Sequence, residues 1–371
     1  MSIKVWDYLT EYEIEREEIF DAIEKVFRSG RLILGESVKN FENAFSSYCG
    51  AKYGIGVDNA TDGLFLALKA LTIGKGDEVI TVSNTAVPTV SAIVSAGATP
   101  VFVDIKAGTY LMDIGKVEKA ITNNTKCILP VHLYGQCVAM EPLLDIAKKH
   151  HLNVLEDCAQ AHGSLYKSRK AGSMGDLSVF SFYPTKPLGG YGDGGMVITS
   201  DEALYSKLRR LRFYGMENMY YAEEHGYNSR LDEVHAEILL RKLKRLDANN
   251  NRRRELAKRY QEILAPTTLN LPEEAPDNYH VYYAYVVRHP HRDRIIKALA
   301  EDDIQVSINY PWPIHTMRGY SYLGYKEGDL PETEAAAKEI FSLPMYPTLT
   351  NKEQDIVCSA LSKILGEKIS L

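Results

Sequence analysis

The lysine at position 186 follows an apolar, β-rich run at 177–182 and precedes a loop with five glycines that ends at Gly195. An amine partly removed from water loses some of its preference for the charged form, so more of it is available as a nucleophile. Glycines also let a flat cofactor or a sugar approach the backbone closely. The setting of Lys186 therefore favours imine formation; a solvated lysine on a glycine-rich hairpin is the plainer alternative.

A carboxylate, Asp157, ends another apolar run, at 153–157. A buried carboxylate needs a cationic partner, because an unpaired buried charge costs on the order of several kcal/mol. A protonated pyridine nitrogen supplies one and keeps the ring an electron sink, as in pyridoxal phosphate (PLP) enzymes. Gln160 lies three residues on, where it can hydrogen-bond the 3′ oxygen of the ring. The alternative for Asp157 is an N-cap of the following segment.

Phosphate binding needs backbone N–H groups at a helix start, together with small hydroxyls. The segment 57–68 offers a strand end, a small-residue turn with Thr61 and Asp62, and then a helix. Taken alone, this pattern fits an ordinary capped helix equally well. Ser181, five residues before Lys186, adds another hydroxyl near the lysine.

The elements that must hold these residues follow from the apolar pattern. Strands without polar alternation, separated by helices, indicate a mostly parallel sheet covered on both faces. Ligands bind beyond the carboxyl ends of such strands, where Asp104 and Asp157 stand. The expected strands are 53–57, 78–82, 99–103, 127–131 and 153–157, and the expected helices are 12–30, 37–48, 61–72, 86–96, 114–121 and 140–150.

The second half of the chain completes an α/β protein of two domains. Two more strands are expected within 175–200, with Lys186 between them, followed by a polar helical region from about 229 to 264. A run beginning at Tyr279 then opens a smaller α+β unit. We predict a large cofactor-binding domain at 1–245, including the N-terminal helix, and a small C-terminal domain at 246–371.

Composition excludes several classes of protein. The 371 residues are 45% hydrophobic and 25% charged with a net charge of −6, which is typical of a globular protein and argues against a nucleic-acid partner. There is no apolar leader and no run of about 18 apolar residues, so we expect a cytoplasmic protein with no membrane partner. The cysteines are scattered and never spaced C-x-x-C, which predicts reduced thiols and no metal site: Cys49, Cys127, Cys137, Cys158 and Cys358.

Four ordered motifs carry a resemblance to a known family: Asn59–Asp62, Glu156–His162, Ser181–Lys186 and Tyr227–Glu233. With these, the chain resembles the DegT/DnrJ/EryC1/StrS family of nucleotide-sugar aminotransferases. The resemblance implies an aspartate-aminotransferase-like fold (PLP fold type I), with a mostly parallel seven-stranded sheet in the large domain. It spans nearly the whole chain.

The resemblance implies a role for each matching position. Lys186 would hold PLP as an imine and move a proton between Cα of the amine and C4′ of the cofactor. Asp157 would pair with the ring nitrogen, and Gln160 would contact the 3′ oxygen. Thr61, Asp62 (through its backbone N–H) and Ser181 would bind the phosphate.

Two further positions stand out in the comparison with the family. Asn228 matches a residue that reaches the phosphate from the second subunit, which implies a homodimer with the active site at the subunit interface. Some relatives carry an aromatic ring that stacks on the cofactor, and this chain has Ala86 at that position.

The likeness extends to the substrate. It is closest to dTDP-3-amino-3,6-dideoxyhexose transaminases, which implies L-glutamate as amino donor and C3 of a dTDP-3-keto-6-deoxyhexose as acceptor. Tyr183, Tyr310 and His315 would then face the sugar, although His315 could equally be a structural histidine.

Four alternatives remain open at this stage. The acceptor could be a UDP-linked 3-keto sugar, such as a 2-acetamido uronate, or a 4-keto nucleotide sugar. The family's dehydratases replace the lysine with histidine, so Lys186 speaks against that activity. A non-catalytic regulatory member of the fold is the last alternative, against which the set of Lys186, Asp157 and Gln160 argues.

Overall fold

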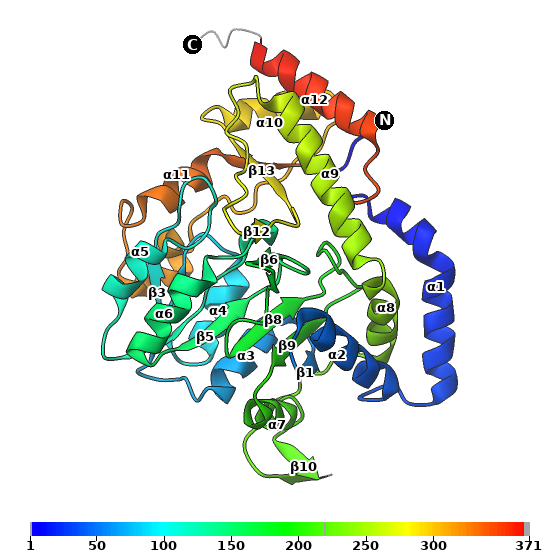
Figure 1. The fold of residues 1–371 in the computed structure, drawn as a ribbon, viewed down its shortest axis with the longest axis vertical. Coiled ribbons are helices and arrows are strands. Elements are labelled where there is room, and N and C mark those ends of the chain that lie inside the picture. Colours follow the sequence, from blue (N-terminus) through cyan, green and yellow to red (C-terminus); the bar gives the residue numbers. More distant parts are fainter. Residues whose placement is uncertain (1, 219, 367–371) are drawn as a thin grey trace.

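A seven-stranded sheet organises the chain in the computed structural model, which describes residues 2–218 and 220–366. The strand order is β1-β9-β8-β5-β4-β2-β3 (Figure 1). Strand β9 is antiparallel to both neighbours, and every other pair in the sheet is parallel. The predicted mostly parallel sheet is confirmed. Its strands are β1 (Tyr53–Val57), β2 (Glu78–Val82), β3 (Thr99–Val103), β4 (Thr125–Ile128), β5 (Asn153–Asp157), β8 (Leu177–Ser181) and β9 (Gly195–Thr199).

One strand differs from its expected range: β4 ends at Ile128, before the predicted limit at 131. Pro130 has no N–H to donate to a ladder, which stops regular pairing there. Its carbonyl still accepts the N–H of Asp157 at 2.9 Å. The chain after β4 therefore stays beside the end of β5, where the predicted site residues lie.

Helices connect and cover these strands (Figure 1). Glycines in the left-handed conformation end the first two helices, at Gly30 (φ 68°) and Gly50 (φ 82°), because a side chain there would be strained. The helices of this part are α1 (Tyr8–Ser29), α2 (Glu36–Cys49), α3 (Ala60–Ala70), α4 (Val87–Ser95), α5 (Ile114–Val117), α6 (Met140–His150), α7 (Glu202–Leu211) and α8 (Glu233–Leu243).

A second hydrophobic core forms in the C-terminal part. The antiparallel pair β13 (Tyr285–Arg288) and β14 (Ile340–Leu343) packs with helices α9 (Leu246–Leu264), α10 (Arg292–Glu301), α11 (Pro331–Glu339) and α12 (Asn351–Gly366). Ile3, from the N-terminus, also belongs to this core. The predicted helical region at 229–264 is thus two helices, α8 and α9. The domain division at 245/246 stays a prediction.

Short strands complete the fold. One small sheet joins β12 (Asn278–Tyr279), β6 (Leu165–Tyr166) and β7 (Arg169–Lys170). The hairpin of β10 (Met216–Asn218) and β11 (Tyr221–Ala222) projects beyond α7 (Figure 1). Tyr221 in this hairpin is 63% exposed. The hairpin therefore presents aromatic surface outside the body of the chain.

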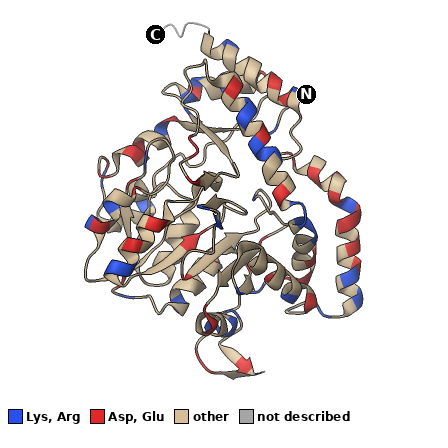
Figure 2. Cartoon of the chain, viewed as in Figure 1, with Lys and Arg blue, Asp and Glu red and all other residues tan. Residues whose placement is uncertain are grey.

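The charged residues are distributed without a single dominant sign. Both acidic and basic side chains lie along α1 and α9 (Figure 2). None of the helices in the described ranges is long and apolar enough to cross a membrane.

Candidate active site

A cavity of about 230 Å³ lies at the carboxyl ends of β5 and β8, beside the first turns of α3 and α4. Parallel strands bring their carboxyl ends to one edge of a sheet, so residues distant in sequence meet there. Six of the predicted site residues line it: Thr61, Asp157, Gln160, Ser181, Tyr183 and Lys186. A neighbouring cavity of about 370 Å³ shares Tyr183 and Lys186 and also includes Tyr310.

A third cavity is larger, at about 800 Å³, and lies between α2 and α7. None of the predicted site residues lines it. Size alone therefore does not identify the site in this chain; the grouping of reactive side chains does.

The carboxylate of Asp157 is buried at the end of β5. Its oxygens accept hydrogen bonds from Thr89 Oγ1 at 2.9 Å and from the Ala159 N–H at 3.1 Å. Burial raises the pKa of Asp157, and these bonds and the nearby Lys186 offset that effect only in part. A protonated ring nitrogen would supply the missing positive charge, so the residues fit a pyridine cofactor.

The Lys186 amine points over an aromatic ring, with Nζ 4.6 Å from the ring centre of Tyr283. The face of a tyrosine ring attracts a cation, which orients the amine in the cavity. The backbone N–H of Lys186 bonds to the Tyr183 carbonyl at 2.9 Å, which fixes the turn that carries it. In the sequence, Tyr283 is one of four tyrosines within 279–285, and nothing in that run distinguishes it from the others.

The amide of Gln160 is held at both ends. Its Oε1 accepts the Tyr134 N–H at 2.7 Å, and its Nε2 donates to the Tyr310 hydroxyl at 3.0 Å. Because a backbone N–H can only donate, this contact fixes which end is the oxygen. One Nε2 hydrogen remains for a ligand oxygen, which fits the predicted contact with the 3′ oxygen.

The phosphate end needs a correction for Asp62. The backbone N–H of Asp62 donates at 2.8 Å to the side chain of Asn59, which is the N-cap residue of α3. Asp62 does not line the cavity. Thr61 and Asn59 do line it. Gly195 permits this arrangement, since a Cβ there would lie 2.6 Å from the carbonyl carbon of Asn59. The motif therefore provides a capped helix start with Thr61 at the cavity wall.

His315 does not reach the cavity. It is 1% exposed, and its nitrogens contact Ser83 Oγ at 2.8 Å and Glu334 Oε1 at 3.1 Å. The prediction that His315 faces the sugar is wrong in this structure, because both ring nitrogens already have protein partners. The structural alternative holds.

Two other positions can be placed directly. Ala86 is the N-cap residue of α4 and lines the cavity with a methyl group in place of an aromatic ring. Asn228 is exposed, pairs with Phe213 and does not line the cavity of its own chain.

Comparison with known proteins agrees with this geometry. Residues 13–362 match the model of the DegT/DnrJ/EryC1/StrS aminotransferase family. The chain belongs to this family.

Relatives of this aminotransferase are similar over nearly their whole length. It is 54% identical to the dTDP-3-amino-3,4,6-trideoxy-alpha-D-glucose transaminase of Micromonospora megalomicea subsp. nigra, over 98% of this chain and 99% of the relative. It is 45% identical to the dTDP-3-amino-3,6-dideoxy-alpha-D-galactopyranose transaminase of Aneurinibacillus thermoaerophilus, over 94% and 95%. The structure of DesV from S. venezuelae in complex with a ketimine intermediate superposes with a TM-score of 0.97, at 40% identity and 100% coverage of both chains.

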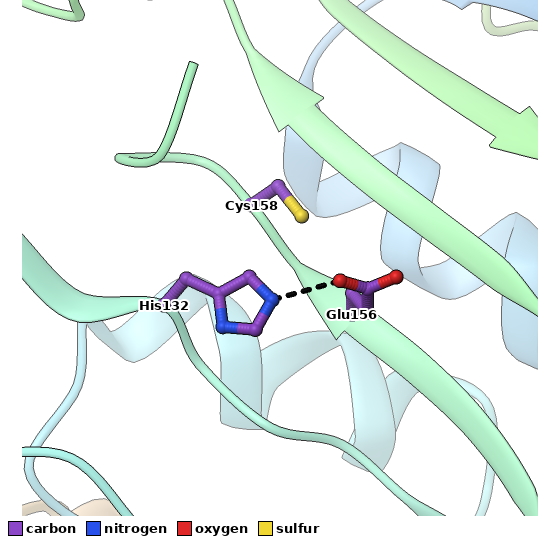
Figure 3. Close-up of side chains that lie close together, drawn as sticks. All are labelled: His132, Glu156 and Cys158. Carbon is purple, nitrogen blue, oxygen red and sulfur yellow. Dashed lines mark hydrogen bonds and ion pairs between the residues drawn. The ribbon is translucent and has the colours of Figure 1, made fainter. Parts of the chain in front are cut away.

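A buried cluster on the other side of β5 contains His132, Glu156 and Cys158 (Figure 3). His132 Nε2 donates to Glu156 at 2.8 Å, and His132 Nδ1 accepts the Val138 N–H at 3.1 Å. Glu156 also accepts the N–H groups of Gly172, Met174 and Gly175.

These bonds give the cluster a structural role in the aminotransferase. Burial by itself opposes ionisation, but the hydrogen bonds, that of His132 first, hold the pKa of Glu156 below its ordinary value. Both ring nitrogens of His132 are occupied, so a metal ion would have to displace existing bonds. Through the hydrogen bonds to Glu156, the cluster holds the turn at 172–175 against β5.

Proposed function

We propose that this aminotransferase uses PLP to move an amino group from L-glutamate to C3 of a dTDP-3-keto-6-deoxyhexose. The product is a dTDP-3-amino-3,6-dideoxyhexose. One observation carries the proposal: Lys186, Asp157, Gln160 and Ser181 line one cavity, at positions suited to four different parts of the cofactor.

Different residues bind different parts of the cofactor. Asp157 retains a proton on the ring nitrogen, while Thr89 and the Ala159 N–H orient its carboxylate. Thr61 and Ser181 donate hydroxyl hydrogens to the phosphate. The bound cofactor supplies an electron sink for the amine's α-carbon.

Lys186 is the group that moves protons. Its amine would hold the cofactor, and as a free base it would carry a proton between Cα of the donor and C4′. The ring of Tyr283, 4.6 Å from Nζ, would hold the free amine in the cavity. A short distance between the base and the reacting atoms matters, because a misplaced base loses much of the rate gain that proximity provides.

The sugar assignment rests on the named relatives and on the walls near Lys186. Both named relatives act on dTDP-linked sugars with nitrogen at C3. Tyr183 and Tyr310 stand beside Lys186 with hydroxyls that can bond a sugar. Burial raises the pKa of Tyr310, so its phenol stays protonated and remains a donor.

We further propose a homodimer in which Asn228 reaches the phosphate of the second subunit. Asn228 is exposed and does not line its own cavity. The projecting hairpin β10–β11 lies on the same segment, with Tyr221 exposed. Mixing an Asn228→Ala subunit with a Lys186→Ala subunit should restore activity, since half of the mixed sites would be intact; no restoration would refute a shared site.

The first test is optical. Protein loaded with PLP should absorb in the near ultraviolet or visible region, and L-glutamate should bleach that band. Borohydride should fix the cofactor on the wild-type chain and leave Lys186→Ala unlabelled, with the exposed Lys126→Ala as control. A labelled Lys186→Ala chain would refute the assignment.

The second test locates the new amine. The enzyme is incubated with dTDP-linked and UDP-linked 3-keto and 4-keto sugars, and products are examined by NMR. We expect amination at C3 of the dTDP sugar. Amination at C4, or of the UDP sugar only, would refute the substrate assignment while leaving the transaminase activity intact.

A further inference from the structure

The turn Leu133–Gly135, after β4, contacts the active site without lining either of the two cavities at Lys186. Its central residue, Tyr134, is 3% exposed and has a φ of 58°. This left-handed conformation is uncommon for a residue with a side chain, and it persists where surrounding contacts hold it. The contacts of Tyr134 therefore show what the conformation provides.

The backbone N–H of Tyr134 sets the direction of a chain of hydrogen bonds. It donates to Gln160 Oε1 at 2.7 Å, so the amide nitrogen of Gln160 faces the other way. That nitrogen, Nε2, donates to the Tyr310 hydroxyl at 3.0 Å. The hydroxyl of Tyr310 thus accepts from Gln160, and within the described chain its own hydrogen has no acceptor. This hydrogen is available to a ligand.

The side chain of Tyr134 reaches Tyr310 by a second route. Its hydroxyl donates to the backbone carbonyl of Asn309, which immediately precedes Tyr310. Burial raises the pKa of Tyr134 well above its ordinary value, so the phenol keeps the hydrogen that it donates. One residue therefore fixes the backbone beside Tyr310 and, through Gln160, the direction of the Tyr310 hydroxyl.

Gly135 anchors the turn against two other segments. Its carbonyl accepts the Val281 N–H at 2.9 Å and the Ser164 hydroxyl at 2.7 Å. Its φ is 100°, and a Cβ at this position would lie 3.0 Å from the backbone nitrogen of Tyr283. The chain therefore packs closely around the turn, so the two bonds made by Tyr134 start from a fixed support.

The bond between Gln160 and Tyr310 joins the walls of the two cavities. Gln160 lines the cofactor cavity, Tyr310 lines the cavity of about 370 Å³ beside it, and Lys186 lines both. The direction of the Tyr310 hydroxyl is thus set next to the lysine, although Tyr134 itself touches neither cavity.

We propose that Tyr134 is a positioning residue, which acts through Gln160 and Asn309 to present the Tyr310 hydroxyl as a hydrogen-bond donor to the acceptor sugar. The inference rests on the proposed transamination of a dTDP-linked keto sugar and adds how one sugar contact is directed. A keto sugar offers carbonyl, ring and hydroxyl oxygens, all of which accept hydrogen bonds, so a donor of fixed direction suits it.

The first experiment measures sugar binding without reaction. The probe is dTDP-6-deoxyglucose, which has no keto group to aminate, titrated by calorimetry into the enzyme loaded with PLP. Tyr310→Phe removes the donor, and Tyr134→Phe removes only the bond to Asn309; each should raise Kd roughly fivefold, the effect of one neutral hydrogen bond. The double variant should also lose roughly fivefold, because Tyr134 acts through a hydroxyl that is already absent.

A matched variant separates positioning from general loss of stability. Tyr260 is buried in the C-terminal core and its hydroxyl donates to the Pro344 carbonyl at 3.0 Å, the same kind of bond that Tyr134 makes. Tyr260→Phe and Tyr134→Phe should lower the urea midpoint by similar amounts, but Tyr260→Phe should leave Kd within about twofold. The glutamate half-reaction of Tyr134→Phe, followed by cofactor absorbance, should also stay within about twofold.

A second variant tests the direction of the chain and does not depend on the folding of Tyr134→Phe. In Gln160→Glu, one carboxylate oxygen can still accept the Tyr134 N–H, but the other can only accept from Tyr310. The Tyr310 hydroxyl should then turn its hydrogen to the carboxylate. Adding Tyr310→Phe to Gln160→Glu should therefore leave Kd within about twofold, in contrast to its effect on the wild type.

The other results decide against the inference. An unchanged Kd in Tyr134→Phe refutes it, as does a roughly 25-fold loss in the double variant, which would mean that the two tyrosines act independently. A fivefold effect of Tyr310→Phe that persists in Gln160→Glu would refute the directed hydroxyl. Equal damage to the glutamate half-reaction would make Tyr134 structural. If the wild type neither binds the probe nor aminates the keto sugar, the proposed function fails first, and this inference fails with it.

Discussion

Two adjacent carboxylates at the end of β5 are both buried and have different environments. Glu156 accepts hydrogen bonds from His132, from three backbone N–H groups and from Ser178 Oγ at 3.2 Å. Within the described part of the chain, Asp157 accepts two, from Thr89 and the Ala159 N–H. Successive side chains of a strand point to opposite faces, so one strand serves both sites.

The difference shows how a buried acid is made structural or functional. The pKa of Glu156 is lowered because its charge is satisfied by the protein, and the pKa of Asp157 is raised because burial outweighs its few partners. An acid left partly unsatisfied beside a cavity is suited to a cationic ligand. The number of hydrogen-bond donors around each carboxylate distinguishes the structural role of Glu156 from the functional role of Asp157.

The largest effect is expected at the functional carboxylate. Asp157→Asn should lower kcat roughly a thousandfold, about 4 kcal/mol in the barrier, because the ring nitrogen loses its counter-charge. The chain without cofactor should be as stable as the wild type or more so at pH 7. Since the folded pKa of Asp157 is raised, its protonated form favours folding at low pH, and that contribution is lost as pH rises through the folded pKa.

Steady-state kinetics and urea unfolding check this prediction, and Glu156→Gln on the same strand is the matched comparison. Normal turnover in Asp157→Asn, or a large loss of its stability, would remove the distinction between the two carboxylates.

The next effect concerns the structural carboxylate. Glu156→Gln should destabilise the fold by about 3 kcal/mol, because an amide nitrogen would face backbone donors in a buried site. Urea unfolding measures it. Refolded protein loaded with PLP should keep more activity than Asp157→Asn; the reverse order would contradict the assignment.

The effect of Glu156 should depend on pH. Its folded pKa is lowered, so its stabilisation is present above the unfolded pKa, about 4.3, and is lost as pH falls through the folded value. The stability difference between wild type and Glu156→Gln should therefore shrink in acid. A constant difference down to roughly pH 3 would indicate a cause other than the charge.

The smallest effect is expected when one of the two hydrogen bonds to Asp157, the one from Thr89, is removed. Thr89→Ala should reduce kcat roughly tenfold, as expected for one hydrogen bond to a charged group. Thr89→Ser should restore most of it. Thr85→Ala, which removes the 2.9 Å contact to the Thr89 hydroxyl and leaves the bond from Thr89 to Asp157, should have a smaller effect; equal losses would mean that the threonines act through packing.

Much of the site could be predicted because its residues lie at strand ends and helix starts. The apolar runs that end at Asp157 and Ser181 specify two strands of a parallel sheet, and such strands converge at one edge. Gln160 and Lys186 follow these strands within a few residues, so their positions were restricted before any packing was known. The same reasoning could not reach Tyr283 or Thr89, which enter the site through contacts between distant segments.

The sequence by itself determined the strand and helix order, the family resemblance and the group of Lys186, Asp157, Gln160 and Ser181, because local pattern and chain connectivity decide them. Only the tertiary structure decided that His315 is buried between Ser83 and Glu334 and that the Asn59 side chain accepts the N–H of Asp62. Hydrogen-bond partners in a folded chain depend on which side chains packing brings within about 3 Å, and this selection is not encoded in any one segment.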